Sequence, residues 1–327
     1  MRIPFAHLTV VLFLAAGLTG CSAERKSMPT AADASLSDGR IIADGAPEGA
    51  GGQGFYPLEL GNHWTFERRF TAVFLEADGS TTPVYDATTS IEAELVCVEM
   101  LNGRSYVVEH DVETYGPDTF EQWVRMRQDA SGLYEADVAT NTPPSCATRP
   151  NRGGGPQRIH EDRDAQIAER LAAVASSPGE LSALQSAWDR IRERHEALHG
   201  VVGPGVGFLG KAGGPESGEI TRLRYSLHTG QSWTIREDPE FTSEDEGGEA
   251  LHTPAGAISV RRIRVDSEFF GPGDRVVFWF GRHEGFVGLN AHTEVIATDV
   301  NGNPIGTFVT DDIINLVGLD LVGPGRF

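Results

Sequence analysis

Apolar and polar residues alternate over most of the chain, which is the pattern of strands that bury one face. In the first half, short runs of β-branched and aromatic residues are separated by turn residues. These runs are 64–66, 71–75, 90–100, 105–112 and 120–126. Asn102-Gly103 stands between two of them and predicts a two-residue hairpin. The first half therefore predicts an antiparallel meander.

Strand patterns return after residue 219, in the runs 221–227, 232–236, 257–265, 275–280 and 288–300. Asn301-Gly302-Asn303 predicts the last hairpin, and we expect residues 311–327 to form a tail. The stretch Glu237–Glu249 contains seven acidic residues and no basic one, so we expect a solvated loop there. Weak binding of a divalent cation is the alternative for this stretch.

A helical period replaces the strand period between the two halves. Ser177-Pro178-Gly179-Glu180 has the form of a capping box with proline at the first helical position. An apolar stripe at helical spacing follows it: Leu181, Leu184, Trp188, Ile191, His195 and Leu198. We therefore expect a mainly β fold, either a twisted antiparallel sheet or a half-open barrel or sandwich, with an α-helical insertion at about 157–200.

A short internal repeat links the two strand-rich halves. Residues 58–65 and 227–234 share the pattern L-x-x-G-x-x-W-T, which describes a turn at glycine followed by a strand. We expect the two copies to lie at equivalent edges of two sheet halves. Trp64, Trp233 and Trp279 are candidates for the core or for the lining of a groove.

An apolar run from Leu8 to Leu18 follows Arg2 and is too short to cross a membrane, which indicates an export signal. The quartet that ends it, Leu18-Thr19-Gly20-Cys21, resembles the lipobox of bacterial lipoproteins. The resemblance implies cleavage before Cys21, a thioether-linked diacylglycerol on Cys21 and acylation of the new amino terminus. Ser22 stands where an aspartate would favour retention at the inner membrane, so the outer membrane is the expected location.

This reading divides the chain into three parts. Residues 1–20 are the signal peptide, 21–54 are the lipidated cysteine and a flexible tether rich in Ala, Gly, Ser and Asp, and 55–327 are the β-rich domain.

Four segments of that domain resemble a family of exported bacterial lipoproteins of unassigned function. They are Phe55–Phe66, Leu227–Trp233, Thr253-Pro254-Ala255-Gly256 and, more loosely, Gly281–Val287. The resemblance covers about 55–140 and 220–310 and leaves out the helical stretch. It implies a twisted antiparallel sheet similar to the half-barrel of lipoprotein carriers. The motifs of this family have no known catalytic or binding chemistry.

Charge and cysteine content narrow the function classes. The chain carries 47 acidic and 27 basic residues, a formal charge of −20, and such a surface repels phosphate backbones and anionic headgroups. Nucleic acid is therefore excluded as a partner, and membrane attachment depends on the lipid. With Cys21 lipidated, Cys97 and Cys146 are an even pair in an oxidising compartment, which predicts a disulfide.

His195-Glu196-Ala197-Leu198-His199 is an H-E-x-x-H pattern on the predicted helix. It resembles the zinc metallopeptidase motif, in which His195 and His199 would bind zinc and Glu196 would be the general base. The alternative is structural: His195 completes the apolar stripe and His199 serves the helix terminus. Arg194 beside the motif disfavours a cation, and Glu216, Glu219 and His228 are only nominal third ligands.

The first hypothesis for function is a non-enzymatic envelope lipoprotein with a binding or scaffolding role and no cofactor. Its sheet would present a face to an apolar ligand or to an envelope protein. A zinc peptidase centred on His195, Glu196 and His199 is the first alternative. A structural or adhesion component of the surface is the second.

Overall fold

The computed structural model describes residues 55–136, 138, 141–146, 157–199, 218–237 and 240–322. The predicted signal peptide, Cys21 and the predicted tether lie outside the described residues. Within the described part, no helix is both long enough and apolar enough to cross a bilayer.

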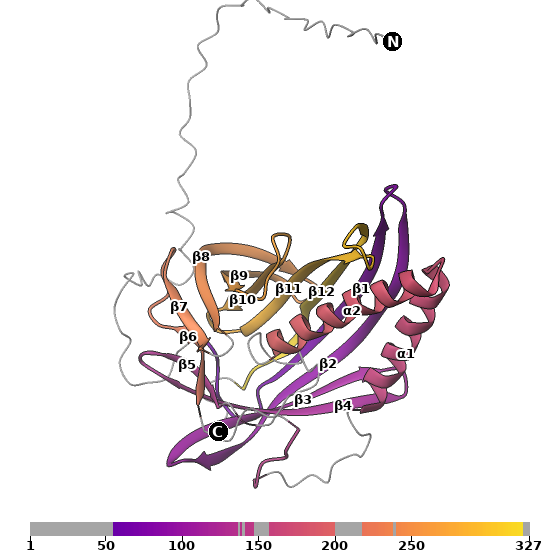
Figure 1. The fold of residues 1–327 in the computed structure, drawn as a ribbon. Helices are drawn as coiled ribbons and strands as arrows, with labels where there is room; N and C mark the ends of the chain where they lie inside the picture. Colours follow the sequence, from indigo (N-terminus) through magenta and orange to yellow (C-terminus); the bar gives the residue numbers. More distant parts are fainter. Residues whose placement is uncertain are drawn as a thin grey trace, which may run out of the picture. The chain divides into compact units, whose positions relative to one another are not determined.

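The described strands form one antiparallel sheet of twelve strands, which confirms the predicted fold class. In chain order the strands are β1 (His63–Glu76), β2 (Thr81–Leu101), β3 (Arg104–Tyr115), β4 (Asp118–Asp129), β5 (Gly132–Ala136), β6 (Glu219–Arg224), β7 (Ser232–Glu237), β8 (Glu240–Thr253), β9 (Gly256–Ser267), β10 (Arg275–Gly281), β11 (Gly285–Thr298) and β12 (Pro304–Asp320). The two helices are α1 (Gln157–Val174) and α2 (Pro178–His199), within the range predicted for the insertion (Figure 1).

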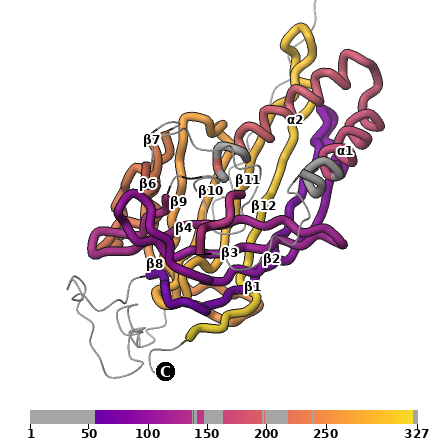
Figure 2. The backbone as a smooth tube through the Cα atoms, turned by 90° about the horizontal axis from the view of Figure 1, so that it is seen from below, coloured from indigo at the N-terminus to yellow at the C-terminus, as the bar shows by residue number. Residues whose placement is uncertain are grey.

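The sheet curves until it is nearly closed into a barrel. Its central strands β1 and β12 pair along almost their whole length, and we call this junction the closed seam. Its two edge strands, β6 and β7, lie side by side (Figure 2), and we call that junction the open seam. Two side chains bridge the open seam to backbone oxygens of β6: Trp233 Nε1 donates to Thr221 O at 3.2 Å and Gln231 Nε2 to Arg224 O at 3.5 Å.

The internal repeat marks the two halves of this barrel, β1–β6 and β7–β12. Gly61 and Gly230 both have a positive φ, 88° and 83°, which L side chains rarely adopt. In each copy, the glycine and the residue after it form two backbone hydrogen bonds with a single residue of the next strand, at 2.7–3.0 Å. The glycine amide donates to the carbonyl of that residue, and the carbonyl after the glycine accepts from its amide. That residue is Leu95 in β2 and Asp245 in β8, and a bulge follows it in both strands. The two copies therefore begin equivalent strands, as the repeat predicted.

One face of the sheet, which we call the inner face, carries both hydrophobic cores. We call the end where β1 begins the strap end, because residues 55–58 pack against the core there. Aromatic residues fill the barrel at this end, with Trp64, Phe66, Phe241 and Phe286 fully buried. At the other end, the helix end, α1 and α2 cover the inner face (Figure 1) and bury Phe70, Phe74 and Phe308 of the sheet. The helices and this part of the sheet therefore form the second core together.

The start of α2 agrees with the predicted cap in one of its two bonds. Ser177 Oγ accepts the Glu180 amide at 3.2 Å, as an N-cap serine does. The Glu180 carboxylate, however, accepts from the Ser176 amide at 2.8 Å, one residue before the position that a capping box requires.

The prediction of a solvated acidic loop at Glu237–Glu249 is wrong, because residues 240–249 belong to strand β8. Arginines of β9 neutralise these acids across the strand pair. Arg261 binds the fully buried Asp245, and Arg264 Nη2 lies 2.6 Å from Glu244 Oε2. The charges that suggested a loop are therefore one side of a cross-strand ladder.

The prediction of a tail at 311–327 is wrong for residues 311–320, which continue β12 in the closed seam. Asp312 suggested exposure, but it faces inward and pairs with Arg68. The runs 64–66 and 71–75 are likewise one strand, β1, because Arg68 between them is buried.

The predicted disulfide is present. Cys97 in β2 is bonded to Cys146, which follows β5, and their Cα atoms are 6.2 Å apart. Beside it, Glu99 Oε1 accepts from the Ser145 amide at 2.8 Å and Glu99 Oε2 from Arg125 Nε at 2.9 Å. The segment after β5 is therefore held to the outer face of β2 and β4 by covalent and ionic contacts.

Candidate functional site

A layer of charged side chains crosses the inner face between the two cores. Arg68 of β1 makes two bonds with Asp312 of β12, at 2.9 and 2.7 Å, and its Nη1 donates to both carboxylate oxygens of Glu113 of β3, at 3.4 and 3.3 Å. Thr89 Oγ1 donates to Glu113 Oε1 at 2.6 Å. Burial lowers the pKa of the Arg68 guanidinium, but Asp312 and then Glu113 outweigh burial and raise this pKa above its ordinary value. The layer thus pairs its central cation with two carboxylates.

Strand β3 contributes two more acids to this face. Glu109, Asp111 and Glu113 occupy alternate positions and are all buried. Tyr56 donates to Glu109 Oε2 at 2.5 Å, and Gln122 donates to Asp111 Oδ2 at 2.7 Å. Val108, His110 and Val112 alternate with these acids along β3. From alternation alone, the side with the two valines would be expected to face the core, but it is the acids that face inward.

The reason for this inversion is visible on the outer face of β3. Val108 there is as fully buried as a core residue, and the His110 ring stacks on Trp123 of β4 with centroids 3.9 Å apart. Both faces of β3 are therefore covered, and alternation alone does not identify the inner one.

A second ion pair completes the layer toward the open seam. Arg222 of β6 donates through Nε to Glu135 Oε2 of β5 at 2.6 Å, and both side chains are buried. On the side of the helices, the Arg163 guanidinium of α1 lies 5.8 Å from the centre of the Phe70 ring. Burial lowers the pKa of Arg163 to about 10.

His195, the first histidine of the H-E-x-x-H pattern, reaches this layer from α2. Its ring is 4% exposed, lies edge-on to Phe70 with centroids 5.5 Å apart, and places Nε2 3.3 Å from Thr310 Oγ1. Burial is the main cause that lowers the pKa of His195 to about 4, the charges of Arg68 and Arg163 lower it further, and Asp312 opposes them. The position fits the structural alternative, in which His195 completes the apolar stripe of the helix.

Among the described residues, no contact joins His195 to another residue of the zinc hypothesis. The side chains of Glu196 and His199 and all of Glu216 lie outside the described part. Among described residues, no group of three His, Cys, Asp or Glu side chains is placed to hold a metal ion. His228 lies in the exposed loop before β7, with Nδ1 3.1 Å from Ser226 O. The zinc hypothesis thus still depends on the sequence pattern alone, because the described residues supply no set of zinc ligands.

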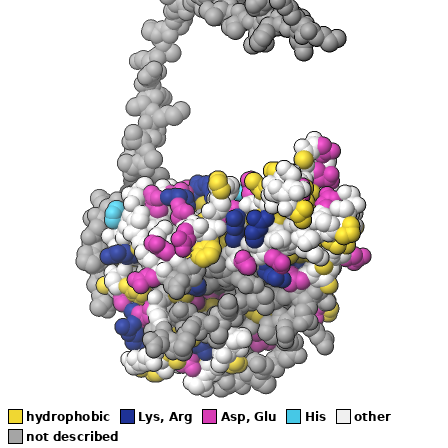
Figure 3. All heavy atoms as spheres, viewed as in Figure 1, with side chains coloured by type: hydrophobic (Ala, Val, Ile, Leu, Met, Phe, Trp, Pro, Cys, Tyr) yellow, Lys and Arg dark blue, Asp and Glu magenta, His cyan; other side chains and the backbone are white. Residues whose placement is uncertain are grey.

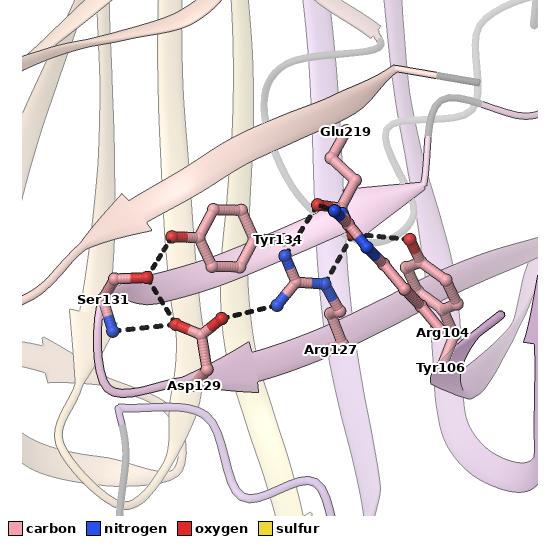
Figure 4. Close-up of polar contacts among 7 residues, drawn as sticks. All are labelled: Arg104, Tyr106, Arg127, Asp129, Ser131, Tyr134 and Glu219. Atoms are coloured by element: carbon pink, nitrogen blue, oxygen red, sulfur yellow. Dashed lines mark hydrogen bonds and ion pairs between the residues drawn. The ribbon is translucent and has the colours of Figure 1, made fainter. Parts of the chain in front are cut away.

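Glu219, another nominal zinc ligand, is held by cations on the outer face (Figure 4). Arg127 of β4 binds both of its carboxylate oxygens, at 2.5 and 2.6 Å, and Arg104 and Tyr106 of β3 bind them too. The bonds from Arg127 are the main cause that lowers the pKa of Glu219 to about 2.

Arg127 also bonds Asp129 at 2.6 Å and lies 4.2 Å from the centre of the Tyr134 ring of β5. Ser131 links Asp129 to the Tyr134 hydroxyl, closing the cluster in Figure 4. The cluster fastens the edge strand β6 across β5 to β4 and β3, so its chemistry is structural.

The three tryptophans predicted for core or groove do not share one environment. Trp64 and Trp233 are buried in the core at the strap end. Trp279 of β10 is partly buried, and its Nε1 donates to Glu249 Oε1 at 2.5 Å. Two of the three are thus core residues, and the inner face that they line is filled by side chains.

The loop between β9 and β10 and the adjoining strand ends line a depression with a volume of about 370 Å³. Arg264, Asp266, Phe270, Asp274 and Arg275 are among the residues that line it. Arg194 of α2 binds Asp274 at 2.7 Å, so the cation that disfavoured zinc in the sequence fixes the helix to this loop. On the face that Figure 3 shows, acidic and basic side chains are interspersed and apolar ones are scattered.

Comparisons with known proteins add two similar structures. No protein-family model matches the chain, and no curated protein matches it. One crystal structure is of a protein described as a lipoprotein from Parabacteroides distasonis, with 11% identity and a TM-score of 0.32, covering 82% of this chain and 99% of that one. The other is of a protein described as exported, with a YmcC-like fold, from Bacteroides fragilis, with 10% identity and a TM-score of 0.32, covering 83% and 100%. A TM-score of this size does not establish a shared fold, and identity this low does not establish a shared function.

Proposed function

We propose that the chain is a lipid-anchored, non-enzymatic protein of the bacterial envelope that binds or scaffolds another envelope protein. The lipobox-like quartet ending at Cys21 supports the anchor, and Ser22 supports the outer membrane as its location. The signal peptide at 1–20 and the tether at 21–54 belong to the same proposal.

The observation that carries the choice of partner is the filled inner face. A carrier of apolar ligands needs an open apolar cavity. Here the described inner face is occupied by aromatic side chains at the strap end, by buried ion pairs in the middle and by α1 and α2 at the helix end. Contact through the polar outer surface therefore fits a protein partner better than an apolar ligand.

The anchor is tested by growing cells with labelled palmitate and isolating the protein. We expect label and outer-membrane fractionation for the native chain, and neither for Cys21→Ala. The matched control is the double variant Cys97→Ser/Cys146→Ser, which removes the other two cysteines and keeps the label. Native protein without label would overturn the proposal of an anchor.

The role is tested on the same purified protein. Organic extraction and mass spectrometry should find no stoichiometric lipid apart from the acyl groups on residue 21, and elemental analysis should find no stoichiometric zinc. A lipid bound one to one would favour the carrier function. Stoichiometric zinc that disappears in His195→Ala would favour the peptidase.

A further inference from the structure

The outer face of the closed seam carries exposed apolar side chains at the helix end. In β1 and β11, Phe74 and Val295 face the second core, so the residues that follow them, Leu75 and Ile296, point to the outer face. Leu75 is 37% exposed and Ile296 is 54% exposed. Both pair with Thr307 of β12, so they lie in one row across three strands.

A second apolar row lies beside the first. Val309 of β12 pairs with Val73 of β1, and Val73 pairs with Pro83 of β2. Pro83 is exposed, and the two valines are half-buried. We call the five apolar residues of the two rows the outer patch: Val73, Leu75, Pro83, Ile296 and Val309. Because the rows are adjacent in the ladder, these side chains form one continuous surface.

Apolar side chains elsewhere on the outer face are covered. Val108 of β3 and Val277 of β10 also point outward, and they are 0% and 2% exposed. Exposure is therefore a property of the outer patch and not of outward-facing apolar residues in general. Contiguous exposed apolar surface with a polar border is typical of a contact site.

The rim of the outer patch is acidic. Glu294 lies beside it in β11, and Glu76 ends β1. Asp78 and Asp299 lie in the turns β1–β2 and β11–β12, which adjoin at this end (Figure 1). Among the described residues, the side-chain partners of these four carboxylates include no lysine or arginine.

Two arginines of α2 reach the same rim from the side of the helices. Arg190 donates to Ile296 O at 2.8 Å, and Arg194 donates to Glu294 O at 3.1 Å. Arg194 is also paired with the carboxylate of Asp274. Among the described residues, the rim therefore keeps more negative than positive charge.

The outer patch is preorganised for contact. Its side chains stand on paired strands, and the adjoining turn is fixed because Asp299 Oδ1 accepts from the amides of Asn301 and Asn303, each at 2.8 Å. This turn presents Val300, which is 89% exposed. A surface that is already rigid loses little conformational entropy when it binds.

The acidic rim distinguishes between the occupants that an apolar surface could have. Two copies of this chain would bring two acidic rims together, and anionic headgroups would be repelled in the same way. The bilayer is also disfavoured by position. The predicted tether joins the domain at residue 55 at the strap end, and the 14 residues of β1 place the patch about 45 Å farther along the sheet.

We propose that the outer patch binds an envelope protein through an apolar segment flanked by lysine or arginine residues. The apolar part of such a segment would cover the patch, and its basic residues would meet the acidic rim. This inference rests on the proposed function, because it names the surface and the chemistry of the partner that the function requires.

Photo-crosslinking in cells that make the full-length chain tests the site. Leu75 or Ile296 is replaced by p-benzoylphenylalanine, and the adduct formed under ultraviolet light is analysed by mass spectrometry. We expect an adduct with one envelope protein, and we expect the crosslinked peptide to be apolar with lysine or arginine beside the contact. The same replacement at Thr88 and Thr234, which are exposed on the outer face away from the patch, should give no adduct.

The affinity of the crosslinked protein, once purified, tests the chemistry. Ile296→Glu in the full mature chain should weaken binding at least about tenfold. Thr88→Glu adds the same charge to the same face outside the patch and should change the affinity by less than about twofold. Glu294→Gln should weaken binding at low salt, and this effect should disappear at high salt because the rim charges are screened.

Four results would overturn the proposal: an adduct between two copies of the chain, an adduct with lipid, a contact peptide without basic residues, or equal affinities of Ile296→Glu and the native chain. Adducts from Thr88 or Thr234 alone would overturn the outer patch as the site and leave the proposed function standing. The absence of an adduct at all four positions would count against both.

Discussion

Arg68 and Arg69 are neighbours in β1 and occupy opposite environments. Arg68 is buried and bound to Asp312 and Glu113, whereas Arg69 is exposed on the outer face and pairs with Asp86 at 2.9 Å. We expect Arg68→Met to lower the free energy of unfolding by about 3–5 kcal/mol, because it leaves two buried carboxylates without their cation.

The matched control is Arg69→Met. An exposed ion pair contributes little, so this variant should change the free energy of unfolding by less than about 1 kcal/mol. Urea denaturation at neutral pH compares the two. Equal effects of the two substitutions would show that the Arg68 side chain is hydrated in solution.

His195 predicts a loss of stability on mild acidification. An unfolded histidine binds its proton at about pH 6.5, whereas the buried ring takes it up only at about pH 4. Between these values the unfolded state binds more protons, so stability falls with falling pH, by an amount on the order of 3 kcal/mol. His195→Gln should flatten this slope, measured by urea denaturation at pH 5 and pH 7.

The control for this prediction has the opposite sign. His292 is partly exposed, and although burial lowers its pKa, hydrogen bonds to Asp311 and Glu294 outweigh burial and raise it. Its contribution is complete below the unfolded pKa and is lost as the pH rises through the folded one. His292→Gln should therefore steepen the loss of stability on acidification that His195→Gln flattens.

The sequence of β1 does indicate one of the buried charges. The inward positions from residue 64 to 74 read Trp, Phe, Arg, Phe, Ala, Phe. An arginine in an otherwise apolar row predicts a buried cation that needs a carboxylate. Its partners Glu113 and Asp312 lie 45 and 244 residues away, so no local pattern identifies them.

At the scale of elements, α1 and α2 fill the helix end of the barrel as part of its core. Trp188 of α2 packs edge-on against Phe308 of β12, with ring centres 6.3 Å apart. We expect Trp188→Ala to lower the free energy of unfolding by about 3–5 kcal/mol, because it leaves a cavity between helix and sheet.

Gln185→Ala, on the exposed side of the same helix, should change it by less than about 0.5 kcal/mol. Deleting 157–199 extends the test, since it uncovers Phe70, Phe74 and Phe308. Aggregation or loss of cooperative unfolding is expected. A soluble, cooperatively folding deletion would show that the helices are a dispensable addition.

Elements with local signals were predictable, and those fixed by distant partners were not. Asn102-Gly103 does form the hairpin between β2 and β3, with φ of 50° and 77° at the two residues. Pro178 does begin α2. Strand β8 was missed because its acids looked solvated, and Arg261 and Arg264, which neutralise them, come from the next strand.

At the scale of the whole molecule, the halves β1–β6 and β7–β12 meet at both seams. The two seams differ in how their strands are paired. The closed seam has a backbone ladder from His63–Asp320 to Glu76–Gly306, with one register shift between Thr65 and Phe66. The open seam has side-chain bridges, among them the bond from Trp233. We expect amides of β6 and β7 to exchange with solvent faster than those of β1 and β12, because local opening starts where few backbone bonds must break.

Peptide-resolved hydrogen exchange at a fixed pH measures this difference. Equal protection of the two seams would mean that β6 and β7 form a full ladder in solution. The repeat L-x-x-G-x-x-W-T predicted the two halves, but the sequence gives no local sign of which junction pairs, because that depends on the curvature of all twelve strands.

The pairing of β1 with β12 has a consequence for how the protein is made. A polypeptide that leaves the ribosome amino end first presents its earliest strand long before the latest one arrives. Until then β1 has one unsatisfied edge, open to wrong pairing with other chains. Completion of the barrel must wait for the last residues to emerge, so premature termination before residue 304 should yield a product that cannot close and is degraded.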